Sequence, residues 1–303
     1  MITKVKQNFT SLITSALTDD KFAKLSKPRK YFIAKILWLF VSIKGKINFL
    51  QLNRFSNNCE QYFRINFENK FNFQHFNLKM IQGRVKECIV ALDPSYIKKS
   101  GKKTFGLGMY WSGCASKAKW GLDICGFAAV DIIQNIAFHL NAIQTPKSKG
   151  VNLLQYYCQI IKENYLYFKE LTTYLVADSY FAKSEVVQAV TSLGMHFISR
   201  LRDDAVLFYL NREPKTGKRG APKKYEGRVN PHEPDMNFCT LIYNTNELKV
   251  YLYYVRSTSI MQLFTAKPLD VNSVIIHIVF FHLFPSFVIP PIHSNNDLYA
   301  CFC

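Results

Sequence analysis

Two short apolar segments that each end in an aspartate constrain the fold of this chain more than any other feature. Residues 88–93 (CIVALD) and 174–178 (YLVAD) have the length and composition of buried strands. Residues 152–171, between them, have helical length and spacing, with Asn152 at the position of an N-cap. A strand, a long helix and a second strand predict a parallel pair, so Asp93 and Asp178 would meet at one edge of a sheet.

The elements around this pair predict the rest of the sheet. Residues 105–114 and 121–131 are punctuated by glycine and predict two more strands, residues 183–193 a helix and residues 196–200 a last strand. Three strands in an antiparallel meander, followed by parallel strands separated by helices, form the RNase H-like arrangement. We therefore expect an α/β fold with an RNase H-like mixed sheet flanked by helices.

The N-terminal part predicts a helical module. Apolar residues between Tyr31 and Val41 recur at helical spacings, and Pro28 lies just ahead of them, where proline favours a helix start. Residues 46–55 predict a second helix, and the aromatic, Asn-rich stretch 62–76 predicts a connector with short helical turns.

Positive charge limits the possible partners, because a net charge of +18 exceeds what a globular chain of 303 residues needs. Residues 1–86 hold 16 Lys and Arg against four acids, and a second basic cluster lies near residues 212–228. A nucleic acid is the simplest polyanionic partner, and an anionic membrane surface or a ribosome-like assembly are the alternatives. The N-terminal excess favours a DNA-binding module over a helical cap whose lysines are merely solvated.

These features predict four parts: a basic helical module (1–86), an RNase H-like core (87–202), a β-rich insertion (203–256) and an apolar tail (257–303). Strand-like runs at 238–243 and 250–255 define the insertion. The tail contains one Lys and two Asp and lacks an amphipathic period. A shifted reading frame or a truncation explains this break better than a divergent domain end, and prolines and histidines within 274–291 argue against a membrane anchor.

Asp93 and Asp178 also indicate the chemistry. Either aspartate alone would be expected to cap a strand end, but two neighbouring carboxylates repel each other unless they share a cation. Oxygen ligands suit Mg²⁺ or Mn²⁺, and such sites support phosphoryl transfer. The eight cysteines contain no CxxC pair, which indicates free thiols in a reducing compartment, and the N-terminus has no signal-peptide pattern. We therefore expect a cytoplasmic protein.

Six segments, taken in order, carry a more specific signal: residues 90–102 (VALDPSYIKKSGK), 106–114 (GLGMYWSGC), 137–146 (AFHLNAIQTP), 176–183 (VADSYFAK), 198–204 (ISRLRDD) and 217–227 (GKRGAPKKYEG). Together they resemble bacterial insertion-sequence transposases with a DDE catalytic domain. The resemblance runs from about residue 30 to about residue 255.

The resemblance implies roles for particular residues. Asp93 and Asp178 match the first and second metal-binding acids. The candidate DNA contacts are Arg200 and Arg202 on the strand after the second acid, Lys218, Arg219, Lys223 and Lys224 in the basic loop, and Lys27, Arg29 and Lys30 in the N-terminal module. The alternative for the loop is a solvated run of charge.

One part of the family pattern is missing. The third acid should be a Glu on a helix beyond the insertion, yet after Arg256 the sequence offers only Asp270 and Asp297. Tyr253, Arg256 and Lys267 repeat part of the expected spacing, but Ile260 stands where the Glu would be and lies in a predicted strand.

The resemblance implies a transposase that cuts and rejoins DNA with Mg²⁺ or Mn²⁺, using water and then a DNA 3′-hydroxyl as nucleophiles. Its partners would be double-stranded transposon ends and target DNA, with self-association on paired ends, at the bacterial nucleoid and without a membrane. Because the third acid is lacking, we expect this copy to be impaired. The alternative is a catalytically inactive remnant that only binds DNA.

Overall fold

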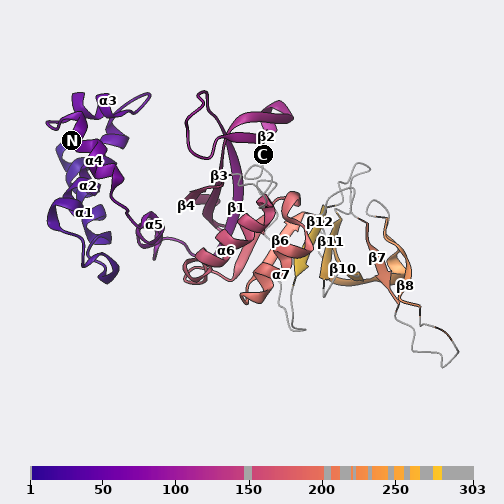
Figure 1. Cartoon of the computed structure of the whole chain (residues 1–303). Helices are drawn as coiled ribbons and strands as arrows, with labels where there is room; N and C mark the ends of the chain where they lie inside the picture. Colours follow the sequence, from indigo (N-terminus) through magenta and orange to yellow (C-terminus); the bar gives the residue numbers. More distant parts are fainter. Residues whose placement is uncertain are drawn as a thin grey trace. The chain divides into compact units, whose positions relative to one another are not determined.

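The chain folds into two compact units, Met1–Val85 and Lys86–Cys303 (Figure 1). The computed structural model describes residues 2–146, 152–200, 206–211, 220, 223–230, 234–244, 249–255, 260–266 and 276–281. Each unit is described by itself. The finer division of the second unit into core, insertion and tail stays a prediction.

The first unit is helical, as the sequence predicts. Its elements are α1 (Ile2–Ala16), the 3-10 turn η1 (Asp20–Phe22), α2 (Lys27–Ser42), α3 (Phe49–Arg54), α4 (Glu60–Glu68) and α5 (Phe73–Ile81). The prediction of a connector with short helical turns over residues 62–76 is wrong, because the regular helices α4 and α5 occupy most of this stretch. Asn72 begins α5 as its N-cap and accepts a hydrogen bond from the backbone N–H of His75 at 3.0 Å. Asparagine thus starts a helix here instead of marking a turn.

Aromatic side chains fill the core of this unit. Phe22, Phe32, Phe63 and Phe76 are buried. Phe22 stacks on Phe71, with ring centroids 5.3 Å apart. The aromatic residues that suggested an irregular connector therefore supply the buried faces of α4 and α5.

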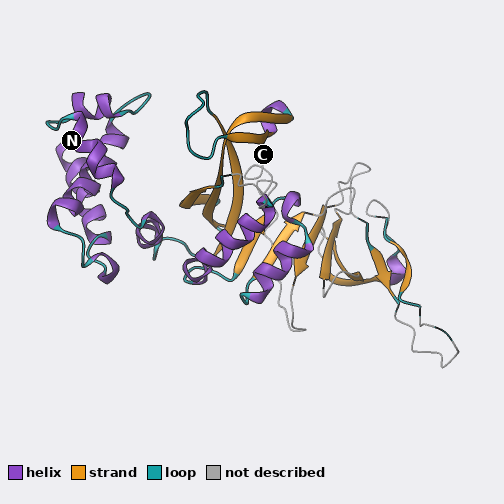
Figure 2. Cartoon of the chain, viewed as in Figure 1, coloured by secondary structure: helices purple, strands orange, loops and turns teal. Residues whose placement is uncertain are grey.

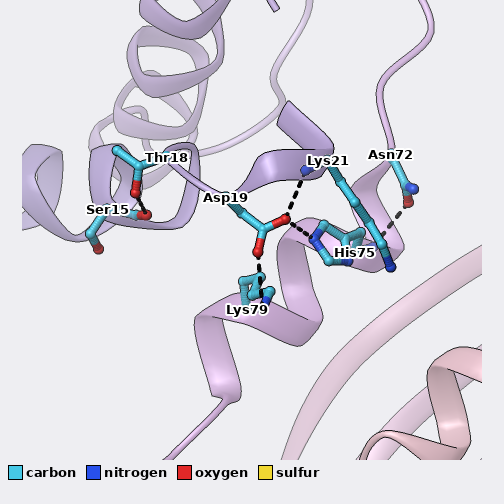
Figure 3. A network of polar contacts seen from close by, with 7 residues as sticks. All are labelled: Ser15, Thr18, Asp19, Lys21, Asn72, His75 and Lys79. Atoms are coloured by element: carbon cyan, nitrogen blue, oxygen red, sulfur yellow. Dashed lines mark hydrogen bonds and ion pairs between the residues drawn. The ribbon is translucent and has the colours of Figure 1, made fainter. Parts of the chain in front are cut away.

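A polar network joins the end of α1 to α5 in the first unit (Figure 3). The Asp19 carboxylate accepts from the backbone N–H of Lys21 at 3.0 Å and lies 2.7 Å from Nε2 of buried His75. Its other oxygen lies 3.0 Å from Nζ of Lys79. The hydrogen bonds from His75 and Lys79 lower the pKa of Asp19, so this carboxylate is ionised at neutral pH.

The second unit contains a mixed α/β sheet, which confirms the predicted fold class. Its central strands follow the order β4-β3-β1-β5-β6. Strands β1, β3 and β4 pair antiparallel, whereas β5 pairs parallel with β1, and β6 with β5. The bounds are β1 (Cys88–Lys98), β3 (Lys117–Asp131), β4 (Ile136–Gln144), β5 (Tyr174–Ala177) and β6 (His196–Arg200).

Two helices cover one face of this sheet (Figure 2). They are α6 (Leu153–Lys169) and α7 (Ser184–Ser192), close to the predicted spans. Asn152 caps α6 by accepting from the backbone N–H of Leu154 at 3.0 Å, as its position indicates. Phe127 of β3 packs on Phe168 of α6, with ring centroids 4.8 Å apart.

The third strand of the meander differs from the prediction. Residues 105–114 form only the short strand β2 (Gly108–Ser112), which pairs with the outer end of β3. The third long strand is instead β4, reached through a turn in which Asn135 has a φ of 53°. The turn contains neither Gly nor Pro, but Asp131 stabilises it by accepting from the backbone N–H groups of Ile133 and Gln134, both at 2.9 Å.

The remaining strands extend the sheet beyond β6. They are β7 (Phe208–Leu210), β8 (Tyr225–Arg228), β9 (Cys239–Asn244), β10 (Lys249–Val255), β11 (Ile260–Ala266) and β12 (Ile276–Phe281). The two strands expected near residues 238–243 and 250–255 are present as β9 and β10. Strand β12 pairs antiparallel with β6, and β11 lies between β12 and β10. In the described residues no helix is long and apolar enough to cross a membrane.

Candidate functional site at the carboxyl ends of two strands

Asp93 and Asp178 occupy equivalent positions in the register of the neighbouring strands β1 and β5. Leu92 of β1 pairs with Ala177 of β5 in parallel register, and the two aspartates are the next residues of their strands. The placement on adjacent parallel strands expected from the sequence is thus confirmed. Whether the two carboxylates bind a metal stays a prediction.

The surroundings of the pair disfavour the ionised form of both carboxylates. Both side chains reach solvent, yet desolvation at this edge raises the pKa of Asp93 and of Asp178. The backbone N–H of Tyr180 donates to Asp178 at 3.1 Å and opposes the rise, while the charge of Asp93 raises the Asp178 pKa further. A divalent ion would remove this repulsion, because it stabilises both carboxylates in their ionised form.

Arg200 extends the same row. Ala177 of β5 pairs with Ser199 of β6, so Arg200 follows at the level of Asp178. The Ser199 hydroxyl donates to the backbone carbonyl of Asp178 at 2.8 Å and ties the two strand ends together. Asp178 and exposed Arg200 therefore lie at the ends of β5 and β6, beside Asp93, which lies in the middle of β1 where the pairing with β5 stops.

Asp123, a buried acid on β3, lies near this site and is not among the residues predicted from the sequence. It is 6% exposed, and it accepts from the hydroxyls of Thr145 and, at 2.7 Å, of Tyr157. Desolvation and the charges of Asp123 and Asp178 together raise the pKa of Tyr180, which places that phenol near both acids. The sequence does contain a signal for Asp123: it is an acid on the buried face of a strand in which buried and partly exposed residues alternate, and a buried charge needs partners.

No third acid completes a metal cluster in the part of the chain that the structure describes. Within those residues, no group of three or more His, Cys, Asp or Glu lies close enough to hold an ion. Asp270 and Asp297 lie outside the described residues. Ile260 begins β11, so the position that would match the third acid is in a strand, as expected. Two carboxylates fit a divalent cation in kind, but the remaining ligands must come from elsewhere.

The three N-terminal candidates for DNA contact have different surroundings. Lys27 is exposed at the start of α2, and Lys30 is half-buried. Arg29 donates to the backbone carbonyls of Asn66 and Asn69, both at 2.6 Å, near the end of α4. Its guanidinium therefore stabilises that helix terminus, where carbonyls lack partners.

The basic loop is described only at its end. Lys223 and Lys224 are exposed just ahead of β8, and Nζ of Lys223 lies 2.8 Å from the Glu226 carboxylate. This ion pair partly offsets the charge of Lys223. Arg202, Lys218 and Arg219 lie outside the described residues. Their role as DNA contacts stays a prediction.

Comparison with known proteins adds no family. No protein-family model matches the chain, and no curated protein has a significantly similar sequence. The structure itself shows an α/β mixed-sheet fold with N-terminal helices.

Proposed function

We propose that the chain is a DNA-binding protein of the DDE transposase type, whose carboxylate pair supports metal-dependent cleavage and transfer of DNA strands. The observation that carries the proposal is the row Asp93, Asp178 and Arg200 at one sheet edge. The net charge of +18 and the six segments that resemble insertion-sequence transposases support it.

Each residue in the row has a chemical task. Asp93 and Asp178 would hold Mg²⁺ or Mn²⁺, which when bound stabilises negative charge on a reacting phosphate. Arg200, beside Asp178, is placed to bind a phosphate oxygen of the same DNA strand. The hydrogen bond from Ser199 to the Asp178 carbonyl fixes the strand end on which the second carboxylate depends.

The second candidate function is DNA binding without cleavage. It is favoured by the ligand count, since the described residues supply two carboxylates where two-metal chemistry usually uses more. Loss of one electrostatic group in comparable catalysis costs roughly 10²–10³-fold in rate. We therefore expect weak or no cleavage by this chain, with metal binding and duplex binding retained.

One experiment tests the proposal and separates the two candidates. Mn²⁺ binding to the full chain is measured by electron paramagnetic resonance, and cleavage of an end-containing duplex is measured in parallel. Asp93→Asn and Asp178→Asn should each abolish Mn²⁺ binding, whereas Asp20→Asn, the same change at an exposed site of the first unit, should not. Unchanged Mn²⁺ binding in both site variants would refute the metal site, and cleavage well above that of the variants would favour the active enzyme.

A further inference from the structure

Exposed aromatic and sulfur-containing side chains gather on the hairpin formed by β2 and the outer end of β3. Trp111 is 67% exposed and Trp120 is 53% exposed, and Met109 and Ile97 are also exposed. Met109 pairs with Trp120, and Trp111 with Ala118. Large apolar groups held in water on a folded hairpin are characteristic of a binding surface.

The hairpin shares a sheet face with the carboxylate pair. Asp93 of β1 pairs with Gly126 of β3, and Ile97 pairs with Leu122. Residues opposite each other in an antiparallel register share a face, and alternate residues of a strand do so as well. Asp93, Ile97, Met109, Trp111 and Trp120 therefore lie on one face. At about 3.3 Å per residue, roughly 13 Å of strand separates Asp93 from Ile97.

The opposite face of the hairpin is braced against the sheet. Tyr110 is buried, and its hydroxyl lies 3.0 Å from the carbonyls of both Gly106 and Thr145. The Tyr96 hydroxyl donates to the Trp120 carbonyl at 2.7 Å, and its ring packs where Gly121 has no side chain. These contacts hold the backbone of Trp120, so the exposed face is a fixed surface rather than a loose loop.

Positive charge surrounds this surface. Residues 94–122 contain six lysines and no acid: Lys98, Lys99, Lys102, Lys103, Lys117 and Lys119. All six are exposed. Lys117 and Lys119 alternate with Ala118 and Trp120 and so project from the other side of the narrow ribbon. The loop lysines precede Phe105, which is 77% exposed. Aromatic rings beside lysines are the combination that single-strand-binding proteins use.

We propose that the β2–β3 hairpin is a binding platform for an unpaired DNA strand, whose bases stack on Trp111 and Trp120 while the surrounding lysines bind its phosphates. The charge requires a polyanion, and the rings select an unpaired strand, because base faces inside a duplex are already stacked. This inference extends the proposed function. It rests on that function for one point, namely that the nucleic acid is DNA. The platform places unpaired nucleotides on the face that carries Asp93.

The chain provides its own reporter. Its three tryptophans include Trp38 in the first unit, so Trp38→Phe leaves Trp111 and Trp120 as the only indole signals. The full-length Trp38→Phe protein is titrated, with EDTA present, with an oligothymidylate of about 16 nucleotides, near the upper end of single-strand site sizes. Stacking should quench the fluorescence as the strand binds.

Variants are compared by the anisotropy of a labelled oligonucleotide. Trp111→Ala and Trp120→Ala should each weaken single-strand binding about tenfold, within the range for loss of one stacked base. Binding of a blunt duplex should change less than twofold. Trp111→Leu/Trp120→Leu keeps an apolar surface but removes the large rings, and it should behave like the alanine variants. Tyr31→Ala removes an aromatic ring that is 66% exposed in the first unit and serves as the matched control.

Other outcomes would overturn the proposal. Unchanged single-strand affinity in Trp111→Leu/Trp120→Leu would do so, as would a loss of duplex affinity equal to the loss of single-strand affinity. Loss of self-association or of binding to anionic vesicles, with single-strand binding intact, would assign the surface to a second copy or to a membrane. The assay contains no divalent metal, and Asp93→Asn/Asp178→Asn should bind the oligonucleotide normally. Failure of the metal site therefore leaves the result on the platform interpretable.

Discussion

Replacing Asp19 by alanine should destabilise the first unit through the loss of one network. The substitution removes the acceptor for buried His75, which is 2% exposed, and the ion-pair partner of Lys79. A hydrogen bond to a charged group contributes about 1.5–3 kcal/mol. The partly exposed pair with Lys79 adds only about 0.2–1 kcal/mol. We expect a loss of about 2–3 kcal/mol for Asp19→Ala and about 1 kcal/mol for Asp19→Asn, which keeps an acceptor for His75.

Trp38 fluorescence measures this loss within the full chain. In a Trp111→Phe/Trp120→Phe background, Trp38 is the only tryptophan and lies in α2 of the first unit. With a urea dependence of about 2 kcal/mol per molar, within the usual range, the unfolding midpoint of Asp19→Ala should fall by about 1–1.5 M. Asp20→Ala, one residue along and exposed, is the control and should stay within about 0.5 kcal/mol. Superimposable curves for the two variants would refute the assignment of stability to this network.

The pH dependence gives a second test of the same network. The folded-state pKa of Asp19 lies below its ordinary value, because His75 and Lys79 favour the ionised form. The unfolded chain therefore binds the proton first, and the stabilisation is complete above a pH of about 4. It is lost as the pH falls further, through the folded-state pKa. The difference between the native chain and Asp19→Asn should shrink as the pH falls below about 4. A difference that kept its full size as the pH fell well below 4 would contradict this mechanism.

Two further predictions concern DNA affinity and the core of the sheet. Duplex affinity, measured by anisotropy between low and moderate salt, should fall with a log–log slope of about −0.9 per neutralised phosphate and survive Asp93→Asn/Asp178→Asn. A flat salt response would contradict a role for the 16 Lys and Arg of residues 1–86 in binding phosphates. Tyr157→Phe removes a 2.7 Å hydrogen bond to buried Asp123 and should cost about 1–3 kcal/mol in urea unfolding. Tyr156→Phe, on the next residue of α6, tests the same chemical change at a less buried position, and an equal loss there would exclude a specific role for Asp123.

The residues that determine the central sheet carried strong local signals. The apolar runs before Asp93 and Asp178 and the N-cap at Asn152 are features of short segments, so the sequence predicts β5, α6 and the start of β1 closely. The expectation that the first strand ends at Asp93 is wrong, because β1 continues to Lys98 alongside β3. Strand β4 was not predicted because the turn before it contains no Gly or Pro and depends on Asp131 and on Asn135 with positive φ, which are weaker turn signals in a sequence. Helices α4 and α5 were not predicted, because their aromatic residues can be recognised as buried helix faces only once the helices pack together.

The candidate site was predictable in part. Its two acids follow from strand ends, whereas the level of Arg200 depends on the parallel register of β5 and β6, which no local pattern determines. Asp123 joins the region through hydroxyls of Thr145 and Tyr157, which are 22 and 34 residues away in sequence. The hairpin surface depends on the pairing of Met109 with Trp120. Contacts between distant residues therefore limited the prediction more than composition did.

The position of the carboxylate pair follows from where β5 stops. Strand β1 is paired on both sides as far as Leu92, and beyond it only β3 continues alongside. Pro94 stands two residues later, and proline cannot donate a backbone hydrogen bond, so a strand tolerates it where the strand has become an edge. At such an edge Asp93 and Asp178 keep contact with water, and their ionised forms need no complete set of protein partners. The same strand then runs on to Ile97 and the exposed hairpin. Both the carboxylate pair and the hairpin surface that we propose for the unpaired DNA strand thus lie beyond the end of β5.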